Sequence, residues 1–257
     1  MRNLLDLTGR VALITGATGD IGGAIVRLFA EHGADVVVHY AQNKERAEAL
    51  AEEIGCLGRR ALTVQADVAS APEVESMVGQ TVAAFHRLDI LVNNAGVRRK
   101  PGDHKYILDV TEAEWDVELD SHLKAAFLCA RSCLPHMIGQ RFGRIINVSS
   151  VVARSGASGA SVHYPAAKAG MFGFTRALAN QVAANGITVN VVAPGIIDSE
   201  RIRWRTPEQL KDHIAKVPLG RLGTTSEIAA ATLFLASSAA SYITGATIDV
   251  NGGLYMA

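Results

Sequence analysis

The chain has little of several features that mark particular classes of protein. Of its 257 residues only 5% are aromatic and three are cysteines, and its 25 basic and 25 acidic side chains balance. A chain without net charge has no global field that would attract nucleic acid or an acidic membrane surface. No segment approaches the ~18 uncharged apolar residues of a membrane span, and the first residues lack the apolar run of a secretory signal. We therefore expect a cytoplasmic protein that binds neither nucleic acid nor membrane.

The three cysteines show no spacing typical of a disulfide framework. Cys129 and Cys133 lie four residues apart, and His136 follows them closely, so a metal site is one interpretation. The alternative is that these cysteines are small buried apolar residues in a reducing compartment. We favour the second interpretation and expect no bound metal.

Short apolar runs alternate with helix-like segments along the whole chain. The expected strands are 11–15, 36–39, 61–65, 90–92, 144–148, 188–192 and 247–250. The expected helices are 19–32, 44–54, 73–85, 112–119, 123–138, 164–184 and 227–235, with a loop over 97–108. This rhythm predicts an α/β fold of the Rossmann type, a doubly wound parallel sheet with helices on both faces in a three-layer sandwich. We expect one catalytic domain over residues 1–257, with ligands bound beyond the carboxyl ends of the strands.

Glycines cluster where the first strand meets the first helix. Gly16, Gly19 and Gly22 would let the backbone turn sharply and approach a pyrophosphate, and the following helix would direct N–H groups at the anion. An ordinary glycine-rich turn is the alternative, but the position at the first strand–helix junction favours dinucleotide binding.

The second strand ends without the acidic residue that commonly bonds the ribose of NAD. His39, Tyr40 and Ala41 stand there instead, and Lys44 or Arg46 is available to neutralise a 2′-phosphate. We therefore favour NADP(H) over NAD(H), although these residues could equally be ordinary solvated residues at a helix start.

The expected strand 144–148 is followed by residues suited to proton transfer. Ser149 and Ser150 come directly after it, and Tyr164 and Lys168 follow at a spacing that places them on one face of a helix. A phenol is ordinarily a poor base at neutral pH, with a pKa of ~10, and a neighbouring ammonium favours its ionised form.

In these features the chain resembles the short-chain dehydrogenase/reductase superfamily, in its compact single-domain form. The motifs that carry the resemblance are the glycine turn, Asp67-Val68, Asn93-Asn94-Ala95-Gly96, Ser150, Tyr164 with Lys168, Pro194-Gly195 and Val250-Asn251-Gly252-Gly253. Gly220-Arg221-Leu222-Gly223 and Tyr242-Ile243-Thr244-Gly245 are most similar to the 3-oxoacyl-[acyl-carrier-protein] reductases. The resemblance implies an enzyme that interconverts a carbonyl and a secondary alcohol with a nicotinamide dinucleotide.

The resemblance also implies roles for single residues. Ser150 would hold the substrate oxygen, Tyr164 would exchange its proton, and Lys168 would bond the nicotinamide ribose and promote ionisation of the phenol. Ser149 is the alternative to Ser150. The residues expected to contact the cofactor are Gly16, Thr18, Gly19, Asp20, Ile21, Gly22, His39, Tyr40, Ala41, Asp67, Val68, Asn93, Asn94, Ala95, Gly96, Tyr164, Lys168, Pro194, Gly195, Ile197 and Ser199. Members of this family are often homotetramers, so we expect self-association.

Four positions depart from the family pattern. Asp20 stands where the compact type usually has its second glycine, and His122 takes the place of a catalytic Asn. Imidazole can bond water, so we expect His122 to retain the role of that Asn, although a packed histidine without a role is the alternative. Ser150 and Tyr164 are separated by one residue more than expected, with the insertion placed within 155–161. Arg141 matches one carrier-binding position of the acyl-carrier reductases, whereas Asn185 occupies the other.

Two basic segments are expected at the carboxyl ends of the strands. One is a substrate lid over 199–217 with Arg201, Arg203, Trp204, Arg205 and Lys211, and the other is Arg98-Arg99-Lys100. They suggest an anionic substrate, such as a phosphate-bearing acyl thioester or an oxidised sugar acid, although a solvated lid is the alternative.

Three functions remain open: a 3-oxoacyl-[acyl-carrier-protein] reductase, a sugar or alcohol dehydrogenase, and a dinucleotide-binding regulator without catalysis.

Overall fold

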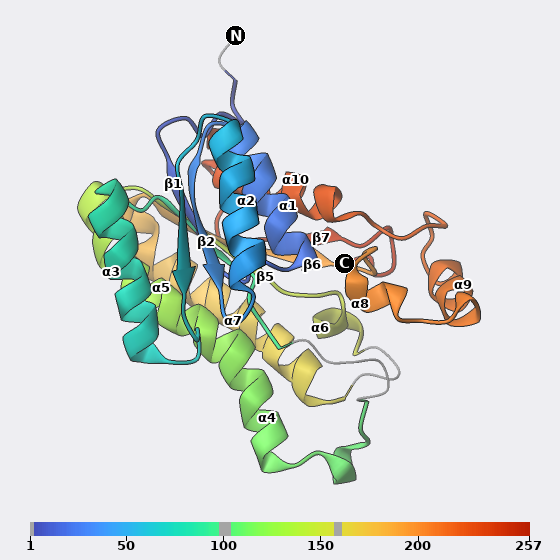
Figure 1. Cartoon of the computed structure of the whole chain (residues 1–257). Helices are drawn as coiled ribbons and strands as arrows, with labels where there is room; N and C mark the ends of the chain where they lie inside the picture. Colours follow the sequence, from blue (N-terminus) through green and yellow to red (C-terminus); the bar gives the residue numbers. More distant parts are fainter. Residues whose placement is uncertain (1–2, 98–103, 157–160) are drawn as a thin grey trace.

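The computed structural model of the chain describes residues 3–97, 104–156 and 161–257, and among these the strands form one parallel sheet. The sheet has seven strands in the order β3-β2-β1-β4-β5-β6-β7 (Figure 1). The strands are β1 (Val11–Ile14), β2 (Asp35–Tyr40), β3 (Ala61–Gln65), β4 (Ile90–Asn93), β5 (Gly143–Val148), β6 (Ile187–Pro194) and β7 (Thr247–Val250). The expected doubly wound parallel sheet is therefore confirmed.

Helices cover both faces of this sheet and create two separate apolar cores. α1 (Asp20–Glu31), α2 (Lys44–Cys56) and α10 (Thr225–Ala236) pack on one face. α3 (Ala71–Phe85), α5 (Ala125–Gln140) and α7 (His163–Val182) pack on the other, and α4 (Glu112–Leu119) lies against α7. Because side chains alternate along a strand, Ala12 and Ile14 face the first core, whereas Val11 and Leu13 face the second.

The strand order reverses between β1 and β4, which are neighbours in the sheet. From β1 the chain continues toward β2 and β3 on one side, and from β4 toward β5, β6 and β7 on the other. The loops after β1 and β4 therefore meet at the switch point of the sheet, which is where open α/β sheets bind ligands. This is the position of the glycine turn and of Asn94-Ala95-Gly96.

The structure differs from the expected elements in three places. A π-helical turn, η2 (Asp120–Lys124), separates α4 from α5, so the long helix begins at Ala125. The 199–217 segment contains α8 (Glu200–Arg203) and α9 (Pro207–Ala215), and Figure 1 shows α9 standing out from the body of the molecule. Further short helical elements are η1 (Ile107–Asp109), within the expected loop, α6 (Val152–Ser155), η3 (Ala183–Asn185) and η4 (Ser238–Ala240). In the described part of the chain, none of the helices combines the length and apolar character needed to cross a bilayer.

Candidate active site

Two glycines give the turn after β1 its shape. Gly16 has a φ of +64°, a left-handed conformation that glycine adopts without steric penalty. Gly22 lies against the Gly16 carbonyl oxygen, so a β-carbon at Gly22 would collide with the turn. α1 begins at Asp20, after Gly19, and the N–H groups of its first turn have no acceptor within the helix itself. Thr18 and Ile21 lie half-buried in the same turn. A turn of this shape, closed by a helix N-terminus, fits the pyrophosphate of a dinucleotide.

The loop after β4 holds this turn in place. The Asn94 side-chain amide donates hydrogen bonds to the carbonyl oxygens of Thr15 at 3.0 Å and Gly16 at 3.1 Å. The Thr15 hydroxyl accepts the backbone N–H groups of Asn94 and Ala95, each at 3.0 Å. The two halves of the sheet are thus bonded together at the switch point, and Ala95 is brought beside the turn.

The Asn93 side chain points into the protein, where it is buried. Its amide donates to Asn147 Oδ1 at 2.8 Å, and the Asn147 amide donates to the Thr175 hydroxyl at 2.8 Å. This buried chain of bonds connects β4, β5 and α7, and so aligns the strand ends with the helix that carries Tyr164 and Lys168.

The second strand supports the glycine turn through His39. The Gly16 N–H donates to His39 Nδ1 at 2.9 Å, and Nε2 lies 2.9 Å from the carbonyl oxygen of Ala66. These two bonds require the neutral ring with its proton on Nε2. Burial lowers the pKa of His39 below its ordinary value, against the opposing effects of the Ala66 carbonyl and the Asp67 carboxylate. His39, which the sequence predicts to contact the cofactor, therefore supports the glycine turn through hydrogen bonds.

The neighbours of His39 at the end of β2 differ in exposure. Tyr40 is buried in the first core, whereas Ala41 is exposed and its carbonyl accepts the Gln65 side-chain amide at 2.8 Å. Asp67 is exposed after β3, where its carboxylate accepts the Ala69 N–H at 2.9 Å, and Val68 is buried beside it.

Asp20 connects three segments that are distant in the sequence. Its carboxylate accepts the Glu200 backbone N–H at 2.7 Å and pairs with the Arg46 guanidinium at 3.1 Å. The glycine turn is thereby bonded both to α2 and to the start of α8. Asp20, the residue that departs from the family pattern, thus links the start of the expected 199–217 lid to Arg46. Arg46 is also the candidate partner of a 2′-phosphate.

α7 presents Tyr164 and Lys168 one turn apart, as their spacing predicts. Lys168 is 5% exposed, and its Nζ lies 6.0 Å from the centroid of the Tyr164 ring. The same Nζ donates to the Val148 carbonyl oxygen at 2.9 Å, which holds the ammonium at the carboxyl end of β5. A buried cation therefore lies beside the phenol.

The two serines after β5 have different environments. Ser149 is buried, and its hydroxyl donates to the Lys168 carbonyl oxygen at 2.8 Å. The Ser150 hydroxyl accepts the Val152 N–H at 3.4 Å, so its own proton remains available to a substrate oxygen. This geometry favours Ser150 over Ser149 for the substrate. Of the segment that holds the extra residue before Tyr164, positions 157–160 lie outside the described residues.

His122 lies beside Tyr164, in the π-helical turn. Its ring is 5.5 Å from the Tyr164 ring between centroids, edge to face, and packs so closely on Gly96 that a side chain there would overlap it. His122 Nε2 is 3.1 Å from Glu118 Oε1. Burial, reinforced by the Lys168 ammonium, lowers the pKa of His122 to about 4, so the ring is neutral at neutral pH.

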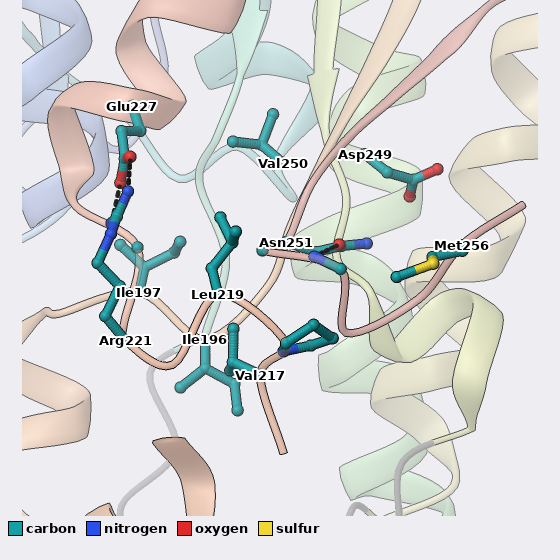
Figure 2. A pocket seen from close by; sticks show the side chains of 14 residues that line it. Ile196, Ile197, Val217, Leu219, Arg221, Glu227, Asp249, Val250, Asn251 and Met256 are labelled. Carbon is teal, nitrogen blue, oxygen red and sulfur yellow. Dashed lines mark hydrogen bonds and ion pairs between the residues drawn. The ribbon is translucent and has the colours of Figure 1, made fainter. Parts of the chain in front are cut away.

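The residues that follow the Pro194-Gly195 motif and those of the C-terminal turn line one hollow. The Gly195 N–H donates to the Val250 carbonyl oxygen at 2.9 Å, and Ile197 is buried beside Gly223. Figure 2 shows Ile196, Val217, Leu219 and Met256 around this hollow of about 440 Å³. Ser150, Tyr164 and Lys168 are not among its lining residues, so it adjoins the lid side rather than the reacting groups.

Part of the positive charge expected around the lid is already compensated. Arg203 pairs with Asp198 at 3.0 Å. Arg221 pairs with Glu227 at 2.6 Å, and Figure 2 shows this second pair. Ser199 directly precedes α8, and its side chain makes no capping hydrogen bond to the helix. Arg98, Arg99 and Lys100 lie outside the described residues.

The helix α5 buries its two thiols. Burial raises the pKa of Cys129 to about 12 and that of Cys133 well above its ordinary value, so neither is a ready thiolate ligand. No group of potential metal ligands occurs among the described residues.

Sequence reasoning missed Glu118 and His163, which are buried beside His122. Glu118 precedes His122 by four residues, a spacing that can join two side chains on one helix face. Nothing in the local pattern indicated that His163, adjacent to Tyr164, is directed into the protein rather than into solvent.

Comparison with known proteins identifies the class that this fold and site define. The family model described as enoyl-(acyl carrier protein) reductase matches residues 16–255. The chain therefore belongs to the short-chain dehydrogenase/reductase family, the NAD(P)-dependent oxidoreductases that act on CH–OH groups.

Particular relatives make the comparison more specific. The 3-oxoacyl-[acyl-carrier-protein] reductase FabG of Staphylococcus aureus is 45% identical over 245 residues, which cover 95% of this chain and 98% of the relative. FabG of Staphylococcus epidermidis is 43% identical over the same length. FabG of Escherichia coli is 40% identical over 252 residues, 98% of this chain and 100% of the relative.

Proposed function

We propose that this protein reduces a carbonyl compound, or oxidises the corresponding secondary alcohol, with NADP(H) as cofactor and Tyr164 as the acid/base. The observation that supports this most directly is the position of the buried Lys168 ammonium, 6.0 Å from the Tyr164 ring. An ammonium beside a phenol stabilises the negative charge that the oxygen carries while its proton is on the substrate. Ser150 lies after the same strand, with a hydroxyl proton available to donate.

The residues then have separate tasks. The glycine turn would hold a nicotinamide dinucleotide, which would supply or accept the hydride when bound. Ser150 donates a hydrogen bond to the substrate oxygen and fixes the carbonyl in place. Tyr164 donates its proton to that oxygen during reduction and takes it back during oxidation. Lys168 stabilises the phenolate while the proton is absent.

Replacing Tyr164 by Phe tests this proposal, because the ring stays and only the hydroxyl group with its transferable proton is lost. We expect turnover to fall at least ~100-fold, while the Kd for NADPH, followed by nucleotide fluorescence, stays within about twofold. Turnover that persists in this variant would contradict the proposal. If the unaltered protein binds NADPH but reduces no ketone, sugar or 3-oxoacyl thioester, it is instead a dinucleotide-binding regulator.

For the substrate, we propose a 3-oxoacyl thioester. The support comes from the relatives named 3-oxoacyl-[acyl-carrier-protein] reductase and from Arg141, exposed after α5. The neutral Asn185 does not add to it, and a sugar or alcohol dehydrogenase is the alternative. Acetoacetyl-coenzyme A and ethyl acetoacetate share the reacting group, but only the first carries phosphates. A kcat/KM at least tenfold higher for the coenzyme A ester supports an anionic substrate bound near the 199–217 lid, and equal values contradict it.

NADP(H) is favoured over NAD(H) because no acid ends β2 and because Arg46 lies near the glycine turn. An acid there would repel a 2′-phosphate, whereas a guanidinium would bind it. Parallel titrations with NADPH and NADH test the preference, and tighter binding of NADH would overturn it.

We further propose that residues 1–257 act as one catalytic domain in a cytoplasmic homotetramer. An apolar groove lined by Leu123, Phe127, Gly170 and Phe174 supports self-association, since Phe127 is 43% exposed. Light scattering of the purified chain tests this, and a monomer at micromolar concentration would contradict it.

A further inference from the structure

Three titratable side chains are buried together behind Tyr164. Glu118 is 1% exposed, His122 5% and His163 0%. His122 Nε2 lies 3.1 Å from Glu118 Oε1, and His163 Nδ1 lies 4.0 Å from Glu118 Oε2. The two oxygens of one carboxylate therefore each face a histidine ring.

The π-helical turn η2 lies within this arrangement. It begins at Asp120, between Glu118 and His122, and has a wider helical repeat than an α-helix. His122, in this turn, faces both the carboxylate on α4 and the Tyr164 ring on α7. Single π turns of this kind occur frequently at functional sites.

A carboxylate so deeply buried is costly unless it is paired and hydrogen-bonded. As an ionised group Glu118 accepts hydrogen bonds only, so the bond to His122 requires the proton on Nε2 and leaves Nδ1 as the acceptor. Among the described residues, Nδ1 is buried without a hydrogen-bond partner. The ring is thus held by Glu118 through one nitrogen, and its other nitrogen lies against Gly96.

We propose that Glu118 is a positioning residue for the reaction at Tyr164, acting through His122 and assisted by His163. The carboxylate sets the orientation and tautomer of the imidazole that packs edge-on against the phenol. This inference rests on the proposed function, because it requires that Tyr164 transfers the proton.

The charged groups around His122 come from each element packed on it. Glu118 faces it from α4, Tyr164 and Lys168 face it from α7, and His163 on α7 faces the other oxygen of Glu118. Burial and the Lys168 ammonium disfavour a proton on His122, whereas the Glu118 carboxylate and the Ala95 carbonyl favour one. A neutral amide in place of the carboxylate therefore moves protonation of His122 to lower pH.

A double-mutant cycle between Glu118→Gln and His122→Asn tests the proposal, with acetoacetyl-coenzyme A and NADPH as reactants. We expect Glu118→Gln to lower kcat about tenfold, the loss typical of one buried charged hydrogen bond, with the KM values unchanged. In the His122→Asn background the same change should alter kcat less than twofold. The acidic limb of the pH–kcat profile should move to lower pH in Glu118→Gln, a shift that a purely structural role would not cause.

Asp116→Asn is the matched control, since it removes the same charge from an exposed position of the same helix. Equal kcat values for Glu118→Gln and Asp116→Asn, with Tyr164→Phe inactive, overturn this inference and leave the proposed function intact. An active Tyr164→Phe variant overturns both. The unaltered protein provides a further test: ¹⁵N shifts of His122 should report the neutral Nε2–H tautomer, and an Nδ1–H tautomer overturns the proposal even if Glu118→Gln fails to fold.

Discussion

The Gly16 N–H donates a 2.9 Å hydrogen bond to His39 Nδ1, so the glycine turn after the first strand is held by a side chain of the second. The other ring nitrogen bonds Ala66 after the third strand. Three strand ends are therefore connected by one buried imidazole.

Replacing His39 by Leu should weaken cofactor binding and destabilise the fold. The change leaves the Gly16 N–H and the Ala66 carbonyl oxygen without their partner, and each buried unsatisfied group costs about 1–3 kcal/mol. We expect a lower Tm and a Kd for NADPH raised about tenfold. His86→Asn is the control, because His86 is exposed with a φ of 58°, which Asn tolerates. An unchanged Kd in His39→Leu would show that the turn holds its shape alone.

Buried neutral histidines should make the protein less stable as the pH falls below 6.5. The folded-state pKa is lowered for His39 and is about 4 for His122, so between these values and 6.5 the unfolded chain binds protons that the folded chain does not. The free energy of unfolding then falls with decreasing pH, by up to about 1.4 kcal/mol per pH unit for each histidine. Urea unfolding between pH 7.5 and 5 measures this slope, and His122→Asn should make it shallower. A slope identical in both proteins would contradict the assignment.

Asp20→Asn should change the cofactor preference. The carboxylate now neutralises Arg46 and anchors the Glu200 N–H, and an amide keeps a hydrogen-bond acceptor but loses the charge. Released from its ion pair, the guanidinium can meet a 2′-phosphate, so we expect the KM for NADPH to fall about threefold relative to that for NADH, within the ~1 kcal/mol of an exposed pair. Steady-state kinetics with both cofactors test this, and Arg46→Ala should reverse the effect. If the ratio of the KM values for NADPH and NADH is unchanged in Asp20→Asn, Arg46 does not bind the 2′-phosphate.

Gly96→Ala should impair catalysis by displacing His122. The added methyl group would occupy the space of the imidazole ring, which then leaves its place beside Tyr164. We expect a clear loss of kcat. Gly79→Ala is the control, because that glycine lies in α3 with open space around it, where alanine stabilises a helix by about 1 kcal/mol. Full activity in Gly96→Ala would show that the ring position is unimportant.

The three thiols should react at very different rates. Cys56 is exposed, whereas Cys129 and Cys133 are buried with raised pKa values. A thiol reagent should modify one equivalent rapidly in the folded protein and two more only after unfolding. Rapid modification of all three would contradict the burial of α5.

The strand–helix rhythm, the glycine turn and the Tyr164–Lys168 spacing could be predicted because each depends on residues close together in the chain. Alternating apolar residues select strands, and a four-residue spacing selects one helix face, whatever the rest of the protein does. The parallel, doubly wound sheet followed from the same rhythm, since parallel strands need right-handed crossovers.

The partners of the site residues could not be predicted in the same way. His39 meets Gly16, Asp20 meets Arg46 and Glu200, and His163 meets Glu118 only once distant segments have packed. Such contacts depend on which side chains share a buried volume, because burial makes an unpaired polar group costly and so selects its partner. Local patterns therefore indicated the candidate residues of the proposed reaction, whereas three-dimensional packing made His39 a support of the glycine turn and buried Glu118 beside His122.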